Sequence, residues 1–260
     1  MKPSPDASHY AYTVYADPAV AEEFDRSRFG GQIGQLVALA QERVLAEFLG
    51  DLRGVTVLDV GSGTGRAALA LARLGATVTA LDTSEQMLSV ARAHAEEAGL
   101  ALEFVPGDAN SLMFADASFD AVVSLRMLMH TPDWPRCLAE MCRVARRRVV
   151  FDYPPLASSA ALQTVVRRAL QLSGRKVETY HVIRTTAVRS NLQAHGFHIS
   201  RLHRQFVLPI PLHRMIGSQR FTEASESVLA ALGLRRILGA PVTIMAERIP
   251  AGSLRELPPR

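Results

Sequence analysis

The chain has 260 residues, of which 48% are hydrophobic, so it can build a sizeable core in one large α/β domain or two small ones. Its formal net charge is +4, but only two of the basic residues are lysine, and the densest basic groups, 146–148 and 235–236, are short and lack interleaved aromatics. This scatter is typical of solvated surface and helix ends. We therefore expect no nucleic-acid partner, and we allow at most transient contact with acidic substrates or a membrane surface.

The cysteines and the hydropathy pattern indicate the cellular compartment in which the protein is expected. Cys137 and Cys142 are five residues apart, which fits neither a metal pair nor the disulfide framework of a secreted protein. The N-terminus has no continuous apolar core behind a basic start, and nowhere do eighteen uncharged apolar residues run together. We expect a cytoplasmic protein without a metal site, an export signal or a membrane span.

Residues 1–50 predict a helical N-terminal segment. Its clearest helix has apolar residues at positions 33, 37, 40, 44 and 48, at spacings of three and four. The part before that helix carries five aromatic residues, Tyr10, Tyr12, Tyr15, Phe24 and Phe29. Such a segment suits a lid over a ligand. An amphipathic packing helix is the alternative, and it applies more strongly to Phe24 than to the tyrosines.

Residues 51–153 alternate between strand-like and helix-like segments. The pattern predicts strands at 55–60, 77–82, 102–108, 119–125 and 147–153, with helices at 66–75, 83–99 and 133–145. Thr83 and Gln86 form a capping box for the second of these helices, and Gly99 stops it. Strands separated by helices of ten or more residues need crossover connections. We therefore predict an α/β fold with a doubly wound, mostly parallel sheet and helices on both faces.

Residues 154–260 contain two further predicted strands, at 197–208 and 241–249, and helices at 160–172, 186–195 and 211–238. Two strands need not form a separate domain, so we expect them to extend the same sheet. The stretches around 153–170 and 205–217 offer apolar walls flanked by arginine and histidine. These walls suit an apolar or aromatic substrate, although core packing explains most such residues.

The first predicted strand runs into three glycines at alternate positions, Gly61, Gly63 and Gly65. In an open parallel sheet, ligands bind beyond the carboxyl ends of the strands, where the first strand-to-helix turn offers backbone N–H groups and a positive helix end. Glycines there allow a tight turn and let a nucleoside-bearing ligand lie on the backbone. A tight turn needed for packing alone is the alternative.

Two carboxylates follow at the same edge of the sheet. Asp82 ends the second strand, 21 residues beyond Gly61, where it can accept both hydroxyls of a ribose. Each such charge-assisted hydrogen bond contributes on the order of 1.5 to 3 kcal/mol. Asp108, in the turn GDAN after the third strand, suits an exocyclic adenine amine, with an ordinary Asx turn as the alternative.

The glycine spacing distinguishes between nucleoside ligands. A dinucleotide fingerprint needs G-x-G-x-x-G, but its sixth position here is Arg66, which opposes a nicotinamide cofactor. The pattern D-x-G-x-G-x-G, from Asp59 to Gly65, together with Asp82 and GDAN, resembles class I S-adenosylmethionine-dependent methyltransferases. The likeness extends through LDTSEQMLSVAR, FDAVVSLRMLMHTPDW and LAEMCRV, and so covers roughly residues 50–152.

The resemblance implies a seven-stranded sheet with an antiparallel last strand, S-adenosylmethionine as cofactor, and methyl transfer to a small molecule. It places the methionine part of the cofactor on the glycine turn, the ribose on the acidic residue that ends the second strand, and the adenine after the third strand. The cofactor-binding residues that it implies are Asp59, Gly61, Ser62, Gly63, Gly65, Asp82, Thr83, Met87, Asp108, Ala109, Ser124 and Arg126. Plain helix core is the alternative for Met87, and residues 124–126 are expected near the sulfonium.

The sequence departs from this family at VARRRVVF, where relatives usually place a Pro-Gly-Gly turn before the fifth strand. Three arginines and a shorter connection stand there instead. Because this connection lies at the edge opposite the cofactor, the departure affects the local turn more than the activity.

His130, in MLMHTPDW, matches a histidine that small-molecule members of this family often have after the fourth strand. A neutral imidazole near the transferred methyl can take a proton from an attacking hydroxyl. A structural histidine bonded to a loop carbonyl is the alternative, because alignment alone lowers much of the barrier to methyl transfer.

The sequence leaves three classes of function open. A methyltransferase acting on a small, apolar or aromatic molecule is favoured, with O-methylation ahead of N- or C-methylation. A catalytically silent adenosylmethionine-binding or assembly protein stays open, and a nicotinamide-dependent reductase is opposed by Arg66. The methyl acceptor, the methylated atom and the oligomeric state are not fixed by the sequence.

Overall fold

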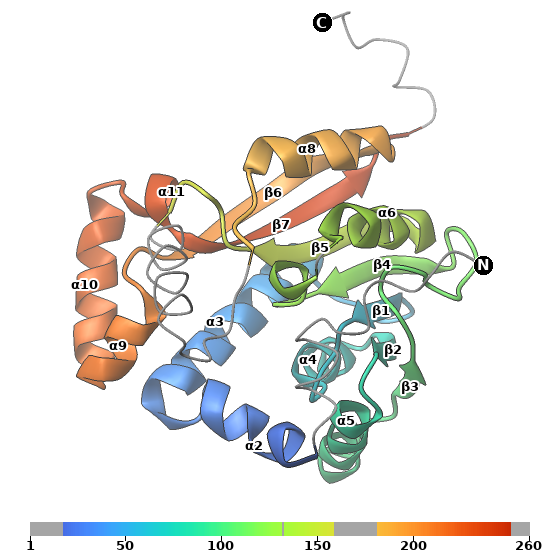
Figure 1. The fold of residues 1–260 in the computed structure, drawn as a ribbon, viewed down its shortest axis with the longest axis horizontal. Coiled ribbons are helices and arrows are strands. Elements are labelled where there is room, and N and C mark those ends of the chain that lie inside the picture. The colour runs from blue at the N-terminus through green and yellow to red at the C-terminus, as the bar shows by residue number, and fades with distance from the viewer. Residues whose placement is uncertain (1–17, 132, 159–180, 251–260) are drawn as a thin grey trace, which may run out of the picture.

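The computed structural model describes residues 18–131, 133–158 and 181–250. They form a seven-stranded sheet in the order β3-β2-β1-β4-β5-β7-β6, flanked by helices (Figure 1). The strands are β1 (Thr56–Val60), β2 (Thr77–Asp82), β3 (Glu103–Pro106), β4 (Phe119–Ser124), β5 (Ala145–Tyr153), β6 (Phe197–Phe206) and β7 (Ala240–Arg248). The first five are parallel, and β7 lies antiparallel between β5 and β6. The predicted sheet and its antiparallel last strand are confirmed.

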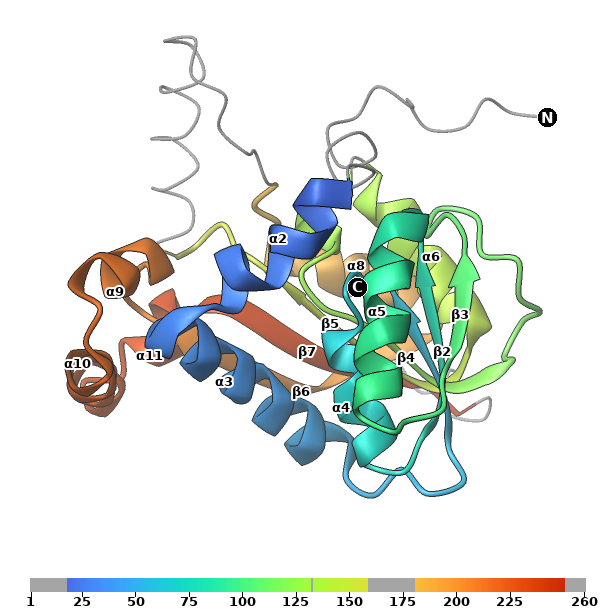
Figure 2. The same ribbon diagram turned by 90° about the horizontal axis from the view of Figure 1, so that it is seen from below.

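Helices cover both faces of the sheet. In Figure 1, α6 (Trp134–Val144) and α8 (Thr185–Ala194) lie above it, while α3 (Gly31–Leu49) and α4 (Arg66–Arg73) lie below. α5 (Glu85–Glu97) packs on β2 and β3, and α2 (Pro18–Phe29) packs against α3 and α5 (Figure 2). Successive side chains of a strand point to opposite faces of the sheet. Val57 therefore packs in the core cluster with α3 and α4, and Leu58 packs in the cluster with α6 and α8.

The strand order reverses between β1 and β4. From β1 the chain proceeds outward through β2 and β3, and then returns to place β4 and β5 on the other side of β1. Parallel strands end at a common edge, so the carboxyl ends of β1, β2 and β4 lie together. This reversal point is where ligands bind in open α/β sheets.

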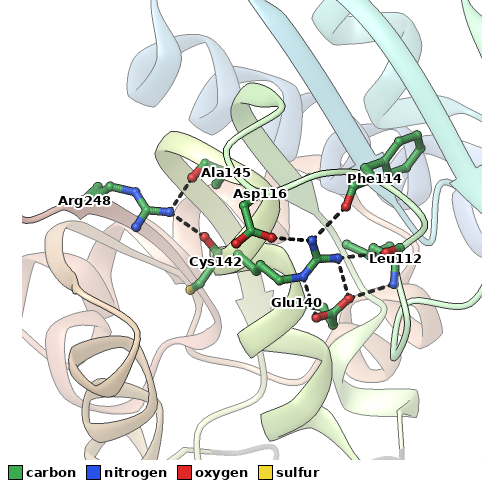
Figure 3. Close-up of polar contacts among 8 residues, drawn as sticks. Leu112, Phe114, Asp116, Glu140, Cys142, Ala145 and Arg248 are labelled. Carbon is green, nitrogen blue, oxygen red and sulfur yellow. Dashed lines mark hydrogen bonds and ion pairs between the residues drawn. The ribbon is translucent and has the colours of Figure 1, made fainter.

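The junction at VARRRVVF has no turn. α6 ends at Val144 and β5 begins at Ala145. Arg248 of β7 donates to the carbonyl oxygens of Cys142 and Ala145, at 2.8 and 2.7 Å (Figure 3). These bonds satisfy carbonyls at the helix end, so an arginine from a distant strand completes a junction that has no glycine-containing turn.

A second arginine, Arg143 of α6, holds the loop that follows β3. Its guanidinium contacts the carboxylates of Glu140 and Asp116 and the carbonyl oxygens of Leu112 and Phe114, each at 2.8 Å. Figure 3 shows these acceptors converging from α6 and from the loop. Because three of the four acceptor residues belong to the loop and only Glu140 to α6, the network fastens the loop to the helix.

Several predicted boundaries change. The predicted helix 211–238 is three helices, α9 (Ile210–Ile216), α10 (Gln219–Ala231) and α11 (Arg235–Leu238), because Gly217 and Gly233 adopt φ of +69° and +76°. The predicted capping box at Thr83 is wrong. Ser84 is the N-cap of α5, and its side chain accepts from the Met87 N–H. The predicted helix 160–172 and the residues Tyr10, Tyr12 and Tyr15 lie outside the described residues.

Across the part of the chain that the structure describes, no helix is long and apolar enough to cross a membrane, and no group of three or more His, Cys, Asp or Glu side chains is placed to hold a metal. Cys137 and Cys142 are both buried and free.

Candidate active site

A cavity lies at the carboxyl ends of β1, β2 and β4, where the strand order reverses, and α2 and α3 close its far side. The turns after β1, β2, β3 and β4 all contribute to its wall. Eleven of the thirteen predicted site residues line it: Asp59, Gly61, Ser62, Gly63, Asp82, Thr83, Met87, Asp108, Ala109, Arg126 and His130. Gly65 and Ser124 do not.

The three glycines have different reasons to lack a side chain. All adopt positive φ, but a Cβ on Gly61 would lie 2.4 Å from Met127 Cγ, and one on Gly65 would lie 2.9 Å from Ala91 Cβ. A Cβ on Gly63 would meet no atom within 4 Å. Gly63 alone therefore offers its backbone to open space. Gly61 and Gly65 also allow the close approach of Met127 and of α5, while Gly61 and Gly63 both line the cavity.

Asp82 connects the turn after β2 with the glycine turn. Its Oδ2 accepts from the Gly63 N–H at 2.8 Å, and its Oδ1 accepts from the Ser84 N–H at 2.9 Å. Burial raises the pKa of this carboxyl, while the N–H groups of Ser84, Gly63 and Thr83 oppose the rise by stabilising the carboxylate. Asp82 thus lines the cavity beside Gly63 and also turns the chain into α5.

Asp59 is a carboxylate deep in the cavity wall. It is 1% exposed, and burial raises its pKa from 3.8 to about 7, with the Ala68 N–H opposing the rise and the charge of Asp82 adding to it. Its Oδ2 has no hydrogen-bond partner among the described residues. A buried acceptor without a partner is costly, so this oxygen suits a cationic or donor group of a ligand.

The turn after β3 also lines the cavity. Asp108 Oδ1 accepts from the backbone N–H and the side-chain amide of Asn110, at 2.9 and 3.0 Å, so the Asx turn is present. Ala109 packs against the core cluster of α6 and also lines the cavity. Met87 is 2% exposed, which makes it core, yet it belongs to the same wall as Thr83.

The two predicted site residues at the end of β4, Ser124 and Arg126, have different surroundings. Ser124 is fully buried and donates its hydroxyl to the Val60 carbonyl at 2.8 Å, so it joins β4 to β1 behind the wall, and its predicted place near the sulfonium is corrected. Arg126 lines the cavity with φ of +61°, and its N–H donates to Asp152 Oδ1. His130 ends a short 3₁₀ turn, Leu128–His130, and also lines the cavity.

α2, near the N-terminal end of the described chain, forms part of the cavity wall. Asp25 of α2 accepts from the Thr64 hydroxyl of the glycine turn at 2.7 Å, and His94 Nδ1 of α5 lies 3.8 Å from its other carboxylate oxygen. Phe24 and Phe29 both line the cavity, with ring centroids 6.4 Å apart. α2 is therefore a packing helix anchored to the glycine turn, and its role as a lid stays a prediction.

Sequence reasoning missed several wall residues, above all Arg66 and Gln41. Arg66 is the first residue of α4, and the sequence pattern indicates only that it breaks the dinucleotide fingerprint. Its guanidinium stacks on the Phe29 ring, 3.2 Å from the centroid, and donates to Gln41 Oε1 at 3.2 Å. Its position directly after the glycine turn was the available signal, but the contact with α2 and α3 is not visible in the sequence.

Residues 58–151 match the family described as "Methyltransferase domain". This part of the chain is similar to methyltransferase domains. S-adenosylmethionine is the cofactor of this family. The Asp59 oxygen that lacks a partner, the exposed backbone at Gly63 and the Asp82 carboxylate give this methyltransferase domain a cavity whose donor set fits that cofactor.

Curated relatives match mainly this domain. The ubiquinone biosynthesis O-methyltransferase of Methylobacterium sp. (strain 4-46) is 39% identical over 100 residues, which are 38% of this chain and 40% of that protein. An uncharacterised protein of Mycobacterium tuberculosis is 37% identical over 121 residues, 44% of each chain. The chain thus spans about two fifths of the length of the curated relatives it matches.

Solved structures match more of the chain at lower identity. The magnesium protoporphyrin IX methyltransferase of Synechocystis PCC 6803 with bound S-adenosylhomocysteine has a TM-score of 0.63 at 20% identity, covering 91% of this chain and 99% of that one. The [4+2]-cyclase SpnF has a TM-score of 0.57 at 21% identity, covering 81% and 80%. These likenesses show the fold, and they extend it beyond the family match.

Proposed function

We propose that the chain is an S-adenosylmethionine-dependent methyltransferase acting on a small apolar or aromatic molecule, with O-methylation favoured. The observation that carries the proposal is the convergence of Asp59, Gly63 and Asp82 on one cavity at the sheet reversal. The relatives named as ubiquinone biosynthesis and magnesium protoporphyrin IX methyltransferases support a small-molecule acceptor.

The residues would hold the cofactor by its polar groups. Asp82, already fixed by two backbone N–H groups, has free lone pairs for the ribose hydroxyls. The unpartnered Oδ2 of Asp59 would accept from the cofactor's ammonium group, which would also return this carboxyl to its ionised form. Thr83, Asp108 and Ala109 would border the adenine.

The bound cofactor supplies an electrophilic methyl group on sulfur. The chain's own contribution is alignment, exclusion of water and, at His130, removal of a proton from the acceptor hydroxyl. His130 and Arg126 follow β4 and line the same cavity, so the acceptor would lie on that side, beneath α2. Arg126 is a wall residue in this proposal rather than a proton carrier.

A silent adenosylmethionine-binding protein is the second candidate. It is favoured by one observation, the likeness to SpnF, which is named as a [4+2]-cyclase rather than as a methyltransferase. Binding occurs under both candidates, so only turnover separates them.

The experiment uses S-adenosylmethionine with a labelled methyl group and a panel of catechols, phenols, amines and prenylated quinols. We expect label transfer by the parent protein and none by Gly63→Val. His130→Ala should lower kcat by about 100-fold with cofactor affinity nearly unchanged, and high pH should restore part of the loss because a pre-ionised acceptor needs no base. Parental kcat across the pH range would leave alignment as the mechanism. Cofactor binding without transfer to any acceptor would favour the silent candidate.

A further inference from the structure

We propose that the outer face of α9, α10 and α11 docks on the surface of an anionic membrane. The proposal goes beyond the proposed function, because docking needs neither the cofactor nor a methyl acceptor. These helices lie between β6 and β7 in the chain, and α10 packs against both α9 and α11. Figures 1 and 2 both show the three helices together at one end of the molecule.

Large apolar side chains are exposed mainly on these helices. Of the eleven that are exposed among the described residues, seven belong to 215–238. Val228, Leu232 and Ile237 are 60%, 69% and 63% exposed. A single exposed apolar residue is ordinary, but a group of them marks a surface that another molecule covers. We call the seven residues the apolar face; they are Met215, Ile216, Phe221, Val228, Leu232, Ile237 and Leu238.

α10 exposes apolar residues and buries polar ones. Phe221, Val228 and Leu232 are separated by seven and four residues, so they lie on one side of the helix. The buried residues of α10 are Thr222 and Glu226, which are four apart on another side. A surface helix ordinarily turns its apolar side to the core. The apolar side of α10 therefore does not serve the packing of this chain.

Buried hydrogen bonds fix α10 in this orientation. The Glu226 carboxylate accepts from the backbone N–H groups of Val207 and Leu208, at 2.8 and 2.9 Å. It also lies 3.1 Å from Nε2 of His213, a buried residue of α9. Rotating α10 to bury its apolar side would take the acceptor away from these N–H groups, which is costly at a buried position. The apolar side consequently stays outward.

The same helices carry positive charge. Residues 209–238 contain four arginines and two glutamates. Arg220, Arg235 and Arg236 are exposed, whereas Glu226 is buried. Exposed apolar side chains beside arginines are typical of helices that lie in the interface of a membrane, where the apolar groups enter the acyl boundary and the cations meet anionic headgroups.

Charge argues against the two occupants that the chain itself offers. A second copy, docked face to face through a two-fold axis, would bring the same arginines of the two copies together. Residues 159–180 also fail to complement the face, because they contain four basic residues and one acidic residue: Arg167, Arg168, Arg175 and Lys176, with Glu178. An anionic bilayer offers hydrocarbon and negative charge together.

The apolar face adjoins the helix that forms part of the cavity wall. Arg214 of α9 donates to the carbonyl oxygen of Arg28 in α2. Arg28 and Phe24 both line the cavity. A docked molecule would thus hold this side of the cavity near the bilayer. An apolar acceptor dissolved in the membrane would then lie close to the site, a consequence that rests on the proposed function, whereas the docking does not.

Flotation of the full chain with lipid vesicles tests the docking, with neither cofactor nor acceptor present. One set of vesicles is phosphatidylcholine alone, and the other contains about 30% phosphatidylglycerol. The parent should bind the anionic vesicles at least about 10-fold more tightly than the neutral ones. Salt at about 0.5 M should remove most of this preference, because it screens the headgroup charge.

Two double variants separate the apolar and the cationic contributions. Val228→Ser with Leu232→Ser should weaken binding to anionic vesicles about 10-fold, since it removes side chains that enter the acyl boundary. Arg235→Gln with Arg236→Gln should remove most of the preference for anionic vesicles. All four side chains are exposed, and circular dichroism checks that the fold is kept.

Matched controls change the same residue types elsewhere on the surface. Met113→Ser replaces an apolar side chain that is 64% exposed in the loop after β3. Arg73→Gln with Arg147→Gln removes two exposed arginines outside the three helices. Both controls should bind vesicles as the parent does.

Binding to anionic vesicles that both double variants weaken and both controls keep supports the docking. It is overturned if the parent binds neither kind of vesicle, if it binds both kinds equally, or if the serine variant binds as the parent does. A dimer in size-exclusion chromatography with light scattering, dissolved by the serine variant, would assign the apolar face to a second copy instead. Each of these results leaves the proposed function standing, because methyl transfer is measured separately.

Discussion

Replacing Asp59 by asparagine should make the unliganded protein more stable above neutral pH. Burial raises the pKa of the Asp59 carboxyl from 3.8 to about 7, so the native state binds its proton more tightly than the unfolded chain does. The free energy of unfolding therefore falls as pH rises between these two values. A shift of about 3 pKa units corresponds to roughly 4 kcal/mol, at about 1.36 kcal/mol per unit.

Asparagine mimics the protonated carboxyl across this range. It keeps an oxygen that can accept the Ala68 N–H, and it carries no charge for burial to penalise. The variant should be more stable than the parent by only about 1 kcal/mol near pH 4.5 and by about 4 kcal/mol at pH 8, both order-of-magnitude figures. Asp152, whose pKa burial raises to about 6, contributes in the same direction to both proteins.

Urea unfolding followed by circular dichroism, from pH 4.5 to 8.5, measures the difference directly. Asp51→Asn is the control: that exposed carboxyl has its pKa lowered by Arg53, so its removal should not produce stabilisation that grows with pH. Parallel stability curves for parent and Asp59→Asn would refute the argument that burial holds this carboxyl protonated. Calorimetry should meanwhile show weaker S-adenosylhomocysteine binding by the variant, because the buried acceptor for the ammonium group has lost its charge.

Three further changes probe the same cavity. Asp82→Ala should weaken S-adenosylhomocysteine binding by about 100-fold, roughly 2.7 kcal/mol, and parental affinity by calorimetry would remove the ribose assignment. Gly63→Val should abolish that binding because its side chain would extend into open space at a strained φ of +54°, with circular dichroism checking the fold and normal binding excluding the turn as the cofactor cradle. Thr64→Val should speed S-adenosylhomocysteine release about 10-fold in stopped-flow measurements, since it removes the 2.7 Å bond to Asp25 that anchors α2. An unchanged release rate would show that α2 does not gate the site.

The sequence by itself determined the features that depend on a few neighbouring residues. Alternating apolar segments and helix periods gave the order of strands and helices, and the rule that parallel strands end at one edge placed Asp59, Asp82 and Asp108 around a single cavity. Three glycines at alternate positions predicted a tight turn, which appears with positive φ at each of them. These inferences hold because backbone preference and side-chain period are local properties.

Sequence pattern does not always identify which of two neighbouring residues makes a contact. Thr83 and Ser84 are both good N-cap residues, and only the path of the chain out of β2 decided that Ser84 caps α5. Ser124 is the last residue of β4, at the edge of the sheet where the cavity lies. Its hydroxyl nevertheless donates to the Val60 carbonyl of the neighbouring strand β1.

Tertiary structure alone decided which contacts each residue makes. Met127 and Ala91, far along the chain, explain why Gly61 and Gly65 have no side chain, and only Gly63 remains open. Arg66 stacks on Phe29, and Arg248 reaches the end of α6. Such contacts join residues separated by tens of positions, so they depend on how helices and strands pack, and a side chain's partners cannot be read from its own neighbours in the sequence.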